Sequence, residues 1–580
     1  MSRKNSLLHV VTLLGLLLGL LVAVPAAQSA PEAPEAITFT GTELLTRPEA
    51  NSISVTIVPN AAITLRYQYS TTSGGPYTTT GNTSAAANVP TTVVLGGLNA
   101  NTRYYYRMQY SQDGGSTWTT RDEYSFWTAR APGSTFTFTI TSDSHVDIVM
   151  GVEATWTNVS NDVLNRGAAD FHLDLGDTVA IRGLNPGQAA EAEQAYKNQL
   201  PYFNRFSQSR AVFLVPGNHE QREGWHLQGT LANSLPVIGV NAQKKYFPMP
   251  VPDGFYTGDS TTQAGITGDQ LRENYYAWTW GDALFVVIDP FWYTTTKPYV
   301  SDLGGGEDDA TGSGDAWDWT LGQTQFNWLK STLQNSNAAY KFVFTHQILT
   351  DASLSQQEDY GHAGANHAHM VEWGGNNENG TTWGWPTERA TWGADPVHQI
   401  MVDEGVSAVF HGHDHQYAYE ERDGVVYQSV PTSGWGDGQS GFNMYTTGDG
   451  YTIRALPNTG HLRVTVSPAQ TTVDYYRMGV TTPTANGTYT IEPTAPTGLL
   501  GDVDGTMTAT STDALIILSA DVGINSSAYC PMNCGDVNAD GFVNSADALI
   551  ILSYNVGLTV PFPVGTGACP SSVTQPLGCN

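Results

Sequence analysis

The stretch TFTFTITSDSH, residues 135–145, is the part of the sequence that decides the fold. It begins with an apolar run, and runs rich in Val, Ile and Phe are typical of strands buried on both faces of a sheet. Segments with a helical pattern, 189–200 and 324–334, lie between some of the runs. Alternating strands and helices predict an α/β domain over residues 133–478, with layered β-sheets flanked by helices. Five further apolar runs follow the first, at 170–175, 211–216, 283–289, 340–345 and 406–410.

Polar residues stand directly after most of these apolar runs. Ligands bind at the carboxyl ends of the strands in open α/β sheets, so side chains at several strand ends are expected to meet in one crevice. The sequence therefore predicts a functional site built from five strand ends. The residues concerned are Asp143 and His145, Asp177, Asn218 and His219 in GNHE, His346, and His413 and His415 in GHDH.

The donor atoms of this set favour metal binding. They are carboxylate and amide oxygens and imidazole nitrogens with no thiolate, a combination that suits Zn, Fe or Mn. Seven donors exceed the needs of one tetrahedral ion but fit two adjacent ions that share a carboxylate. Two such ions can clamp the attacking and leaving oxygens of an in-line phosphoryl displacement, with a hydroxide between them as nucleophile.

The order of these motifs resembles that of the calcineurin-like metallophosphoesterases, and the resemblance extends over roughly residues 134–478. It implies that Asp177 bridges two metal ions. It also implies that His219, which is not a ligand, lies beside the substrate and stabilises charge or protonates the leaving oxygen. The remaining ligands would be Asp143, His145 and His415 for one metal, and Asn218, His346 and His413 for the other.

Purple acid phosphatases are the subgroup that the sequence resembles most, because of the V-F-T-H motif at 343–346 and the preceding β-rich segment. Three positions depart from that subgroup. His145 replaces the glycine of D-x-G, Ala180 stands where G-D-x-x-Y has its tyrosine, and Glu220 replaces the usual aspartate after G-N-H. Without the tyrosine we expect a non-purple site. A phosphomonoesterase acting on a small phosphate ester is favoured, with a phosphodiesterase or nucleotidase as the alternative.

Composition excludes several classes of protein. The 580 residues carry 25 Lys and Arg against 54 Asp and Glu, a formal net charge of −29. Such a chain offers no basic field for nucleic acid, so nucleic-acid binding is not expected. Hydrophobic residues make up 40% of the chain, which excludes wholesale disorder. The length predicts several domains: an all-β sandwich, the α/β core and a small α-helical calcium-loop module.

Residues 1–30 have the pattern of a signal peptide. Arg3 and Lys4 precede an apolar run from Leu7 to Val24, and small residues follow it. The prediction is an exported protein, secreted or held at the cell surface, with no transmembrane span after cleavage. An uncleaved anchor is the alternative.

Residues 31–132 are expected to form a β-sandwich. Short alternating segments such as 52–59, 62–70 and 102–111 are separated by turn clusters rich in Gly, Asn and Asp. The segment LNANTRYYYRMQ, residues 98–109, resembles that of a fibronectin type III domain. No catalytic chemistry is expected in this part of the chain.

A repeat lies beyond a Thr/Pro-rich linker at 479–499. The segment DALIILSADVG at 513–523 returns as DALIILSYNVG at 547–557, within a repeat pair at 500–560. The second loop fits an EF-hand-type calcium site with Gly541 at its turn, whereas Thr506 and Met507 weaken the first. The calcium ligands would be Asp536, Asn538, Asp540, Asn544 and Asp547 in the second loop, and Asp502, Asp504 and Asp513 in the first.

Paired loops of this kind resemble a type I dockerin, which implies docking to a cohesin-bearing scaffold. A calcium-stabilised tail without a partner is the alternative. Four cysteines lie in the last 51 residues, partly in a tail at 561–580. Disulfides are expected there, and neighbours in sequence, Cys530 with Cys534 and Cys569 with Cys579, could pair.

The long segment between His346 and His413 forms either a lid beside the metals or an ordinary surface loop. His362 and His369 within it are candidate substrate contacts. A different class of function is also open: a non-catalytic adhesion or scaffold component that uses the sandwich and the calcium-loop module. A glycosidase would need a paired acid/base carboxylate site, and nothing in the sequence points to one.

Overall fold

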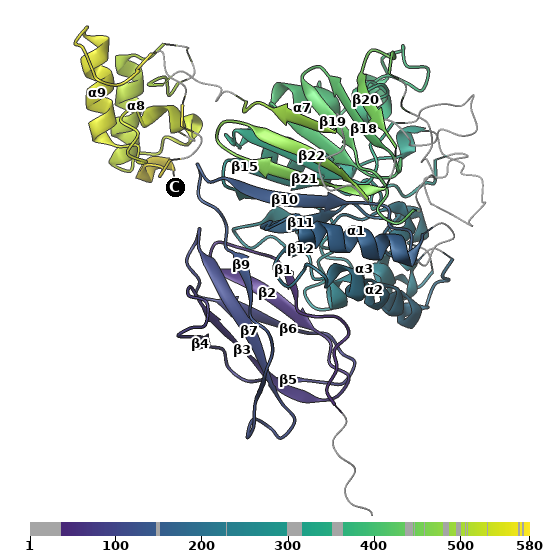
Figure 1. Ribbon diagram of the computed structural model, residues 1–580. Helices are drawn as coiled ribbons and strands as arrows, with labels where there is room; N and C mark the ends of the chain where they lie inside the picture. The colour runs from purple at the N-terminus through teal and green to yellow at the C-terminus, as the bar shows by residue number, and fades with distance from the viewer. Residues whose placement is uncertain are drawn as a thin grey trace, which may run out of the picture. The chain divides into compact units, whose positions relative to one another are not determined.

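The structure is a computed structural model, and Figure 1 shows its helices and strands. No helix in the part of the chain that it describes is long and apolar enough to cross a membrane. The predicted signal peptide lies outside the described residues. These are 36–146, 151–181, 183–227, 229–298, 316–350, 364–435, 445, 447–457, 459–478, 487–494, 500–504, 506, 508–530, 532–565, 569–570 and 573–579.

Residues 44–127 form two antiparallel sheets with the strand orders β1-β2-β6 and β4-β3-β7-β8, in which β5 also pairs with β3 and β9 with β7. Side chains of β3 and β7 alternate between buried and partly exposed, which is the two-residue period of a sheet with one face in a core. The strands are β1 Leu44–Thr46, β2 Ser52–Ile57, β3 Ile63–Ser70, β4 Thr78–Thr79, β5 Thr83–Ala85, β6 Thr91–Gly96, β7 Arg103–Ser111, β8 Thr119–Thr120 and β9 Tyr124–Trp127.

Residues 136–491 contain two mixed sheets. The first has the order β12-β11-β10-β21-β22-β23, with β10, β11 and β12 parallel. The second has the order β13-β14-β15-β16-β17-β19-β18-β20, with β15, β16, β17 and β19 parallel. The first sheet consists of β10 Phe136–Thr141, β11 Phe171–Asp174, β12 Ala211–Leu214, β21 Gly460–Val466, β22 Thr471–Arg477 and β23 Thr488–Ile491. The second consists of β13 Thr257–Gly258, β14 Tyr276–Trp280, β15 Ala283–Val287, β16 Tyr340–Thr345, β17 Ala408–His411, β18 Tyr417–Arg422, β19 Val425–Ser429 and β20 Thr452–Leu456.

The six apolar runs quoted from the sequence are strands β10, β11, β12, β15, β16 and β17, so this prediction is confirmed. Nearly every residue in them is buried. Their continuous apolar character reflects a sheet face on a common core and an opposite face under helices or loops.

Aromatic rings join the two sheets. Phe285 of β15 lies with its ring centroid 5.2 Å from that of Phe138 on β10 and 5.1 Å from that of Phe171 on β11. Phe213 of β12 stacks on Trp278 of β14 at 4.2 Å. Large rings that interdigitate in this way bury much apolar surface, and edge-to-face and stacked pairs add further stability. This aromatic layer is the core of the domain.

Helices lie along the outer faces of the sheets. Figure 1 shows α1, α2 and α3 beside the end of the first sheet formed by β10, β11 and β12. On the second sheet, α4 packs Phe326, Leu329 and Leu333 into a cluster with Val286 and Val343. The helices are α1 Glu153–Asn165, α2 Ala189–Phe203, α3 Leu235–Tyr246, α4 Gly322–Gln334, α5 Val371–Gly374, α6 Trp385–Glu388, α7 Val397–Asp403, α8 Ser511–Asp521 and α9 Ser545–Asn555. Short 3-10 turns occur at Asn218–Glu220, Gly224–His226, Leu231–Asn233, Ala316–Asp318, Ser527–Tyr529, Asn533–Gly535 and Leu577–Cys579.

The two repeat segments form α8 and α9, and the expected pairing of neighbouring cysteines is wrong. Cys530 is bonded to Cys579, and Cys534 to Cys569. The last residues return along the segment that links the helices: the Ser526 amide donates to the Gly578 carbonyl at 3.0 Å, and the Met532 amide to Gln575 Oε1 at 2.9 Å. Each cysteine therefore meets a partner from the returning strand of chain and not its neighbour in sequence.

Phe285→Ala should lower the free energy of unfolding by about 3–5 kcal/mol, because it leaves a cavity between the two sheets. Urea unfolding followed by tryptophan fluorescence measures the change. The control Ile453→Ala, at a side chain that is 47% exposed, should change it by about 0.5 kcal/mol or less. Equal effects of the two variants would contradict a core at Phe285.

Candidate metal centre

The parallel strands carry the predicted polar residues to one edge. Thr141 is paired with Asp174 across β10 and β11, Asp174 with Leu214 across β11 and β12, and Thr345 with His411 across β16 and β17. Strands in this register end at the same level, so the loops that follow them adjoin. All seven predicted metal ligands and His219 are buried.

Five of the seven candidates have a left-handed backbone. The φ angles are 54° at Asp143, 49° at His145, 54° at Asp177, 68° at His413 and 58° at His415. Residues other than glycine adopt this conformation at a cost, and it persists where the surrounding structure imposes it. The sharp turns direct the side chains inward from the strand ends.

The first group of donors consists of Asp143, His145 and His415. The Nε2 atoms of the two histidines lie 2.8 Å apart. Asp143 Oδ1 faces both, at 3.3 Å from His415 Nε2 and 3.5 Å from His145 Nε2. Three donor atoms from two strand ends therefore point at one small space.

The second group consists of Asn218, His346 and His413, with Asp177 beside it. Asn218 Oδ1 lies 3.0 Å from His346 Nε2 and 3.1 Å from His413 Nδ1. Asp177 Oδ2 lies 3.3 Å from His346 Nε2 and 3.9 Å from His145 Nε2. Asp177 thus faces donors of both groups.

Each of the two carboxylates uses one oxygen to join neighbouring loops. Asp143 Oδ2 accepts the backbone N–H of His413 at 3.0 Å, and Asp177 Oδ1 accepts that of His219 at 2.8 Å. The second oxygen of each carboxylate is thereby aimed at the histidine nitrogens. His346 is oriented in the same manner, because its Nδ1 lies 2.7 Å from the Leu175 carbonyl oxygen and leaves Nε2 for the cluster.

The charges of the cluster fit a cation site. Burial raises the pKa of Asp143, but the nearby imidazoles, His415 foremost, outweigh it and hold the pKa well below its usual range. Burial lowers the pKa of His346, and the charge of Asp177 overrides this and raises it to about 10. Buried carboxylates here require positive charge, which protons on the imidazoles or bound cations can supply. The mixture of imidazole nitrogen and carboxylate oxygen suits transition-metal ions.

Comparison with known proteins agrees with this geometry. Residues 136–417 match the family model described as calcineurin-like phosphoesterase. The chain carries a calcineurin-like phosphoesterase domain. No curated protein matches the sequence.

Two solved structures share the fold. The structure of PhoD has a TM-score of 0.51 at 15% identity, covering 79% of this chain and 89% of that one. The purple acid phosphatase PPD1 from seeds of yellow lupin (Lupinus luteus) has a TM-score of 0.50 at 14% identity, covering 78% of this chain and 74% of that one. Identities this low describe likeness of fold alone.

Glu220 holds two loops of the phosphoesterase domain together. Its carboxylate accepts four backbone N–H groups, from Gly217 at 2.7 Å, Asp177 at 3.0 Å, Thr178 at 3.1 Å and Val179 at 2.8 Å. The loop with the candidate bridging carboxylate is thereby fixed to the G-N-H-E turn. Sequence reasoning noted this glutamate as a departure and gave it no function.

Two glycines allow the loops to approach so closely. A Cβ atom at Gly412 would lie 2.1 Å from Ser142 Oγ and 2.8 Å from Asp143 Oδ2. A Cβ atom at Gly217 would lie 2.3 Å from Asp177 Oδ1. Any side chain at either position would displace a candidate ligand.

Sequence reasoning missed a sixth strand-end loop, residues 431–435. The Thr432 hydroxyl donates to the Asp143 carbonyl oxygen at 2.6 Å, and that of Ser433 to the Ser142 carbonyl oxygen at 2.9 Å. The Trp435 ring lies 4.4 Å from that of His415, centroid to centroid. The apolar run VVYQSV, followed at once by PTSGW, is the same signal that identified the other five loops.

The remaining candidates lie as follows. His219 Nε2 is 3.5 Å from Asp177 Oδ2, so this histidine borders the cluster. His369 Nδ1 lies 3.2 Å from Arg422 Nη1, and its Nε2 lies close to Gly380. His362 lies outside the described residues.

In the C-terminal repeat, acidic side chains lie inside both predicted calcium loops. Asp536 accepts the amides of Asp540 and Gly541 at 3.1 and 3.0 Å, and Asp547 those of Val537 and Asn538 at 3.1 and 3.3 Å. Asn544 caps α9. In the first loop the carboxylates of Asp502, Asp504 and Asp513 have oxygens within 4.8 Å of one another. Met507 lies outside the described residues.

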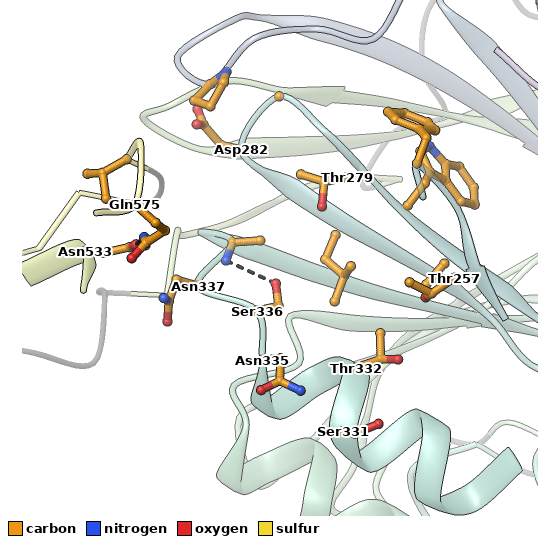
Figure 2. Close-up of a pocket in the computed structure, with 18 of the residues that line it drawn as sticks. Thr257, Thr279, Asp282, Ser331, Thr332, Asn335, Ser336, Asn337, Asn533 and Gln575 are labelled. Carbon is orange, nitrogen blue, oxygen red and sulfur yellow. Dashed lines mark hydrogen bonds between the residues drawn. The ribbon is translucent and has the colours of Figure 1, made fainter. Parts of the chain in front are cut away.

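A separate pocket lies at the turn between β14 and β15 and the end of α4 (Figure 2). Thr279, Thr332 and Asn335 line it, and Asp282 is the one carboxylate among the described residues of its lining. Both Asp282 oxygens accept the Gly133 amide, at 2.9 and 3.0 Å. None of the described residues that line this pocket is a histidine.

Glu220→Gln should weaken the attachment of the Asp177 loop, because an amide offers one acceptor oxygen to four N–H donors. We expect about 10–100-fold weaker metal affinity, as for other residues that support ligands. Titration of metal-free protein with Zn²⁺ or Mn²⁺ in a calorimeter measures this. The exposed Glu388→Gln is the matched control, and equal affinities of the two variants would show that the carboxylate is not needed.

Proposed function

We propose that this protein is a secreted, dinuclear metal-dependent phosphoesterase that hydrolyses phosphate esters, monoesters in preference. The observation that carries the proposal is the convergence of seven donors in a calcineurin-like phosphoesterase domain, with Asp177 facing both groups. The proposed ligands are Asp143, His145 and His415 for one ion, Asn218, His346 and His413 for the other, and Asp177 for both.

The residues of the chain fix the geometry of this site. Two bound cations supply Lewis-acid activation of the phosphate ester and of the attacking water. The left-handed turns and the hydrogen bonds from His413 and His219 hold Asp143 and Asp177 in fixed orientations. Trp435 and the loop 431–435 pack against the first group of donors. Such pre-organisation means that little rearrangement is needed during the reaction.

We further propose His219 as the general acid. Its Nε2 lies 3.5 Å from the Asp177 carboxylate oxygen, which places the ring beside the proposed bridging ligand. An imidazolium at the border of the cluster can hydrogen-bond to a phosphoryl oxygen and pass its proton to the leaving oxygen. Ala180 brings no phenol to the site, so the proposed centre lacks the tyrosinate that colours purple enzymes.

Two rivals remain. A phosphodiesterase or nucleotidase would use the same centre, and a non-catalytic adhesion or scaffold component would use the N-terminal sheets and the C-terminal module. Turnover of a phosphomonoester and a phosphodiester, with Mn, Fe or Zn restored to metal-free protein, separates the three. The absence of both turnover and bound transition metal would favour the adhesion role.

Asp177→Asn should reduce turnover of p-nitrophenyl phosphate by about 100-fold or more, because the amide removes the negative charge that faces both groups. The metal content of the purified variant, measured by mass spectrometry, should fall with the rate. Asp403→Asn, an exposed side chain on α7, is the control with the same chemical change. Full activity of Asp177→Asn would refute a bridging carboxylate.

The C-terminal module is proposed to bind calcium through Asp536, Asn538, Asp540, Asn544 and Asp547, and more weakly through Asp502, Asp504 and Asp513. We propose that it docks to a cohesin-bearing scaffold outside the cell. The carboxylate at the last loop position, Asp547, accepts hydrogen bonds from two backbone amides of its loop. Calcium would remove the repulsion among the acidic side chains.

Asp547→Asn should abolish high-affinity calcium binding in the second loop and lower the calcium-dependent rise in unfolding temperature. Calorimetric titration of calcium into the chelator-treated full chain measures the affinity. The control Glu421→Gln, at an exposed position on β18, should bind calcium with the same affinity as the natural protein. Unchanged calcium binding by Asp547→Asn would remove the assignment of this loop.

A further inference from the structure

One face of the N-terminal sheets carries three arginines in a row. Arg66 lies on β3, and Arg103 and Arg107 lie on β7, at positions that alternate with the buried residues of the same strands. We call these three residues the arginine row. They stand out in a protein with 25 basic and 54 acidic residues.

Strand register sets the spacing of the row. Arg66 is opposite Gln109, and Arg107 is opposite Gln68, so the two arginines are diagonal neighbours on paired strands. Diagonal neighbours lie about 7–8 Å apart. Arg103 is four residues from Arg107 along β7, which corresponds to roughly 13–14 Å. The three positive charges therefore extend along a line of about 20 Å.

Neutral side chains and rings hold the three guanidinium groups. Arg66 Nε donates to Gln109 Oε1 at 2.8 Å, and Arg107 Nε donates to Gln68 Oε1 at 2.9 Å. Arg103 donates to the Ser125 hydroxyl from Nη2 at 3.0 Å.

Each guanidinium also lies over an aromatic ring. The guanidinium carbon of Arg66 is 3.9 Å from the Trp118 ring centroid, and that of Arg107 is 4.1 Å from the Tyr77 centroid. That of Arg103 is 5.2 Å from the Tyr105 centroid. Stacked and hydrogen-bonded arginines are already ordered, so a ligand would lose little entropy in using their other N–H donors.

The arginine row forms no ion pair with a carboxylate of the described residues. The other arginines of residues 36–131 form ion pairs: Arg47 with Glu273 at 2.7 Å, Arg121 with Glu43 at 2.9 Å and Arg130 with Asp170 at 2.6 Å. Within the described part of the chain, no carboxylate oxygen lies within 4 Å of the basic nitrogens of the arginine row. The row is thus a local positive site on an acidic protein.

The pKa of the Glu123 carboxyl group is influenced by the charge of Arg107. Burial is the largest single influence and raises its pKa, but the hydrogen bonds from Ser73, Tyr77 and the Gly74 amide together with the charge of Arg107 outweigh it, so the pKa is lowered. Its oxygens accept the Ser73 hydroxyl at 2.6 Å and the Gly74 amide at 3.0 Å. The carboxylate oxygens of Glu123 therefore accept hydrogen bonds from the turn at 73–74 and form no ion pair with the arginine row. The N–H donors of the row that Gln68, Gln109 and Ser125 do not use can bind an anion.

We propose that the arginine row binds a linear chain of phosphate groups and holds such a polymer on the enzyme. A row of charges matches a linear polyanion, and the planar guanidinium fork matches phosphate oxygens. The preference for phosphate over carboxylate polymers rests on the proposed phosphoesterase function. Since the protein as a whole repels polyanions, the row supplies the local attraction that such a ligand requires.

The test uses the full chain after removal of metals by a chelating resin, so that binding is measured without turnover. The triple variant Arg66→Gln/Arg103→Gln/Arg107→Gln is compared with the natural protein for binding of long-chain inorganic polyphosphate by calorimetry. We expect the Kd to rise at least about 10-fold. The slope of log K against log salt should fall by about 2, which corresponds to three lost phosphate contacts on a single-stranded polyanion.

The control variant Arg205→Gln/Arg454→Gln/Arg477→Gln removes the same charge from partly exposed positions elsewhere and should keep the Kd within about twofold. Turnover of p-nitrophenyl phosphate by metal-loaded protein should be equal in both variants, so failure of binding is distinguished from failure of the phosphoesterase activity. Thermal unfolding checks that the row variant folds, and the single variants Arg66→Gln and Arg103→Gln replace it if it does not.

Three outcomes would overturn the proposal. The first is an unchanged Kd in the row variant, and the second is an equal loss of affinity in the control variant. The third is binding of polygalacturonate, a carboxylate polymer, at least as tight as that of polyphosphate, which would show that the row does not select phosphate. Weak binding of orthophosphate beside tight binding of polyphosphate supports the linear arrangement.

Discussion

Two buried carboxylates, Asp143 and Asp177, face the Nε2 atoms of His145, His346 and His415 at 3.3–4.0 Å, and the phosphoesterase domain depends on this arrangement. Negative charge in a buried position is unfavourable unless cations or imidazolium groups compensate it. The loops must therefore bring donors from distant parts of the chain to one point. Each carboxylate contributes to that by binding a backbone N–H of a neighbouring loop with its second oxygen.

The scaffold supplies the stability that these loops lack. Left-handed backbone at five candidate ligands is strained, and it persists because Glu220 and the loop 431–435 hold the turns from outside. Below the loops, the ring of Phe285 contacts those of Phe138 and Phe171 across the two sheets. This aromatic layer fixes the relative level of the strand ends, and with it the positions of the donors.

Charge is distributed unevenly in this protein. The net charge of −29 favours solubility and opposes polyanions at long range. The proposed metal centre and the proposed anion site at the arginine row would act at short range, where a few ordered groups outweigh a screened surface. The two sites use different chemistry, since one gathers imidazole and carboxylate donors and the other presents guanidinium groups held by glutamines and rings.

The sequence alone determined the strands and the candidate donors. Buried strands such as 340–345 are recognisable because burial on both faces demands a continuous apolar run, and motifs such as G-N-H-E stand directly after them. The tertiary structure decided which atoms meet. His145 and His415 lie 270 residues apart in sequence, with Nε2 atoms separated by 2.8 Å. In the structure, the Glu220 carboxylate accepts four backbone N–H groups, and the Trp435 ring lies beside that of His415. The disulfides join cysteines that are distant in sequence and not the neighbouring ones. Contacts of this kind depend on how whole sheets and returning segments pack, and no local pattern encodes that packing.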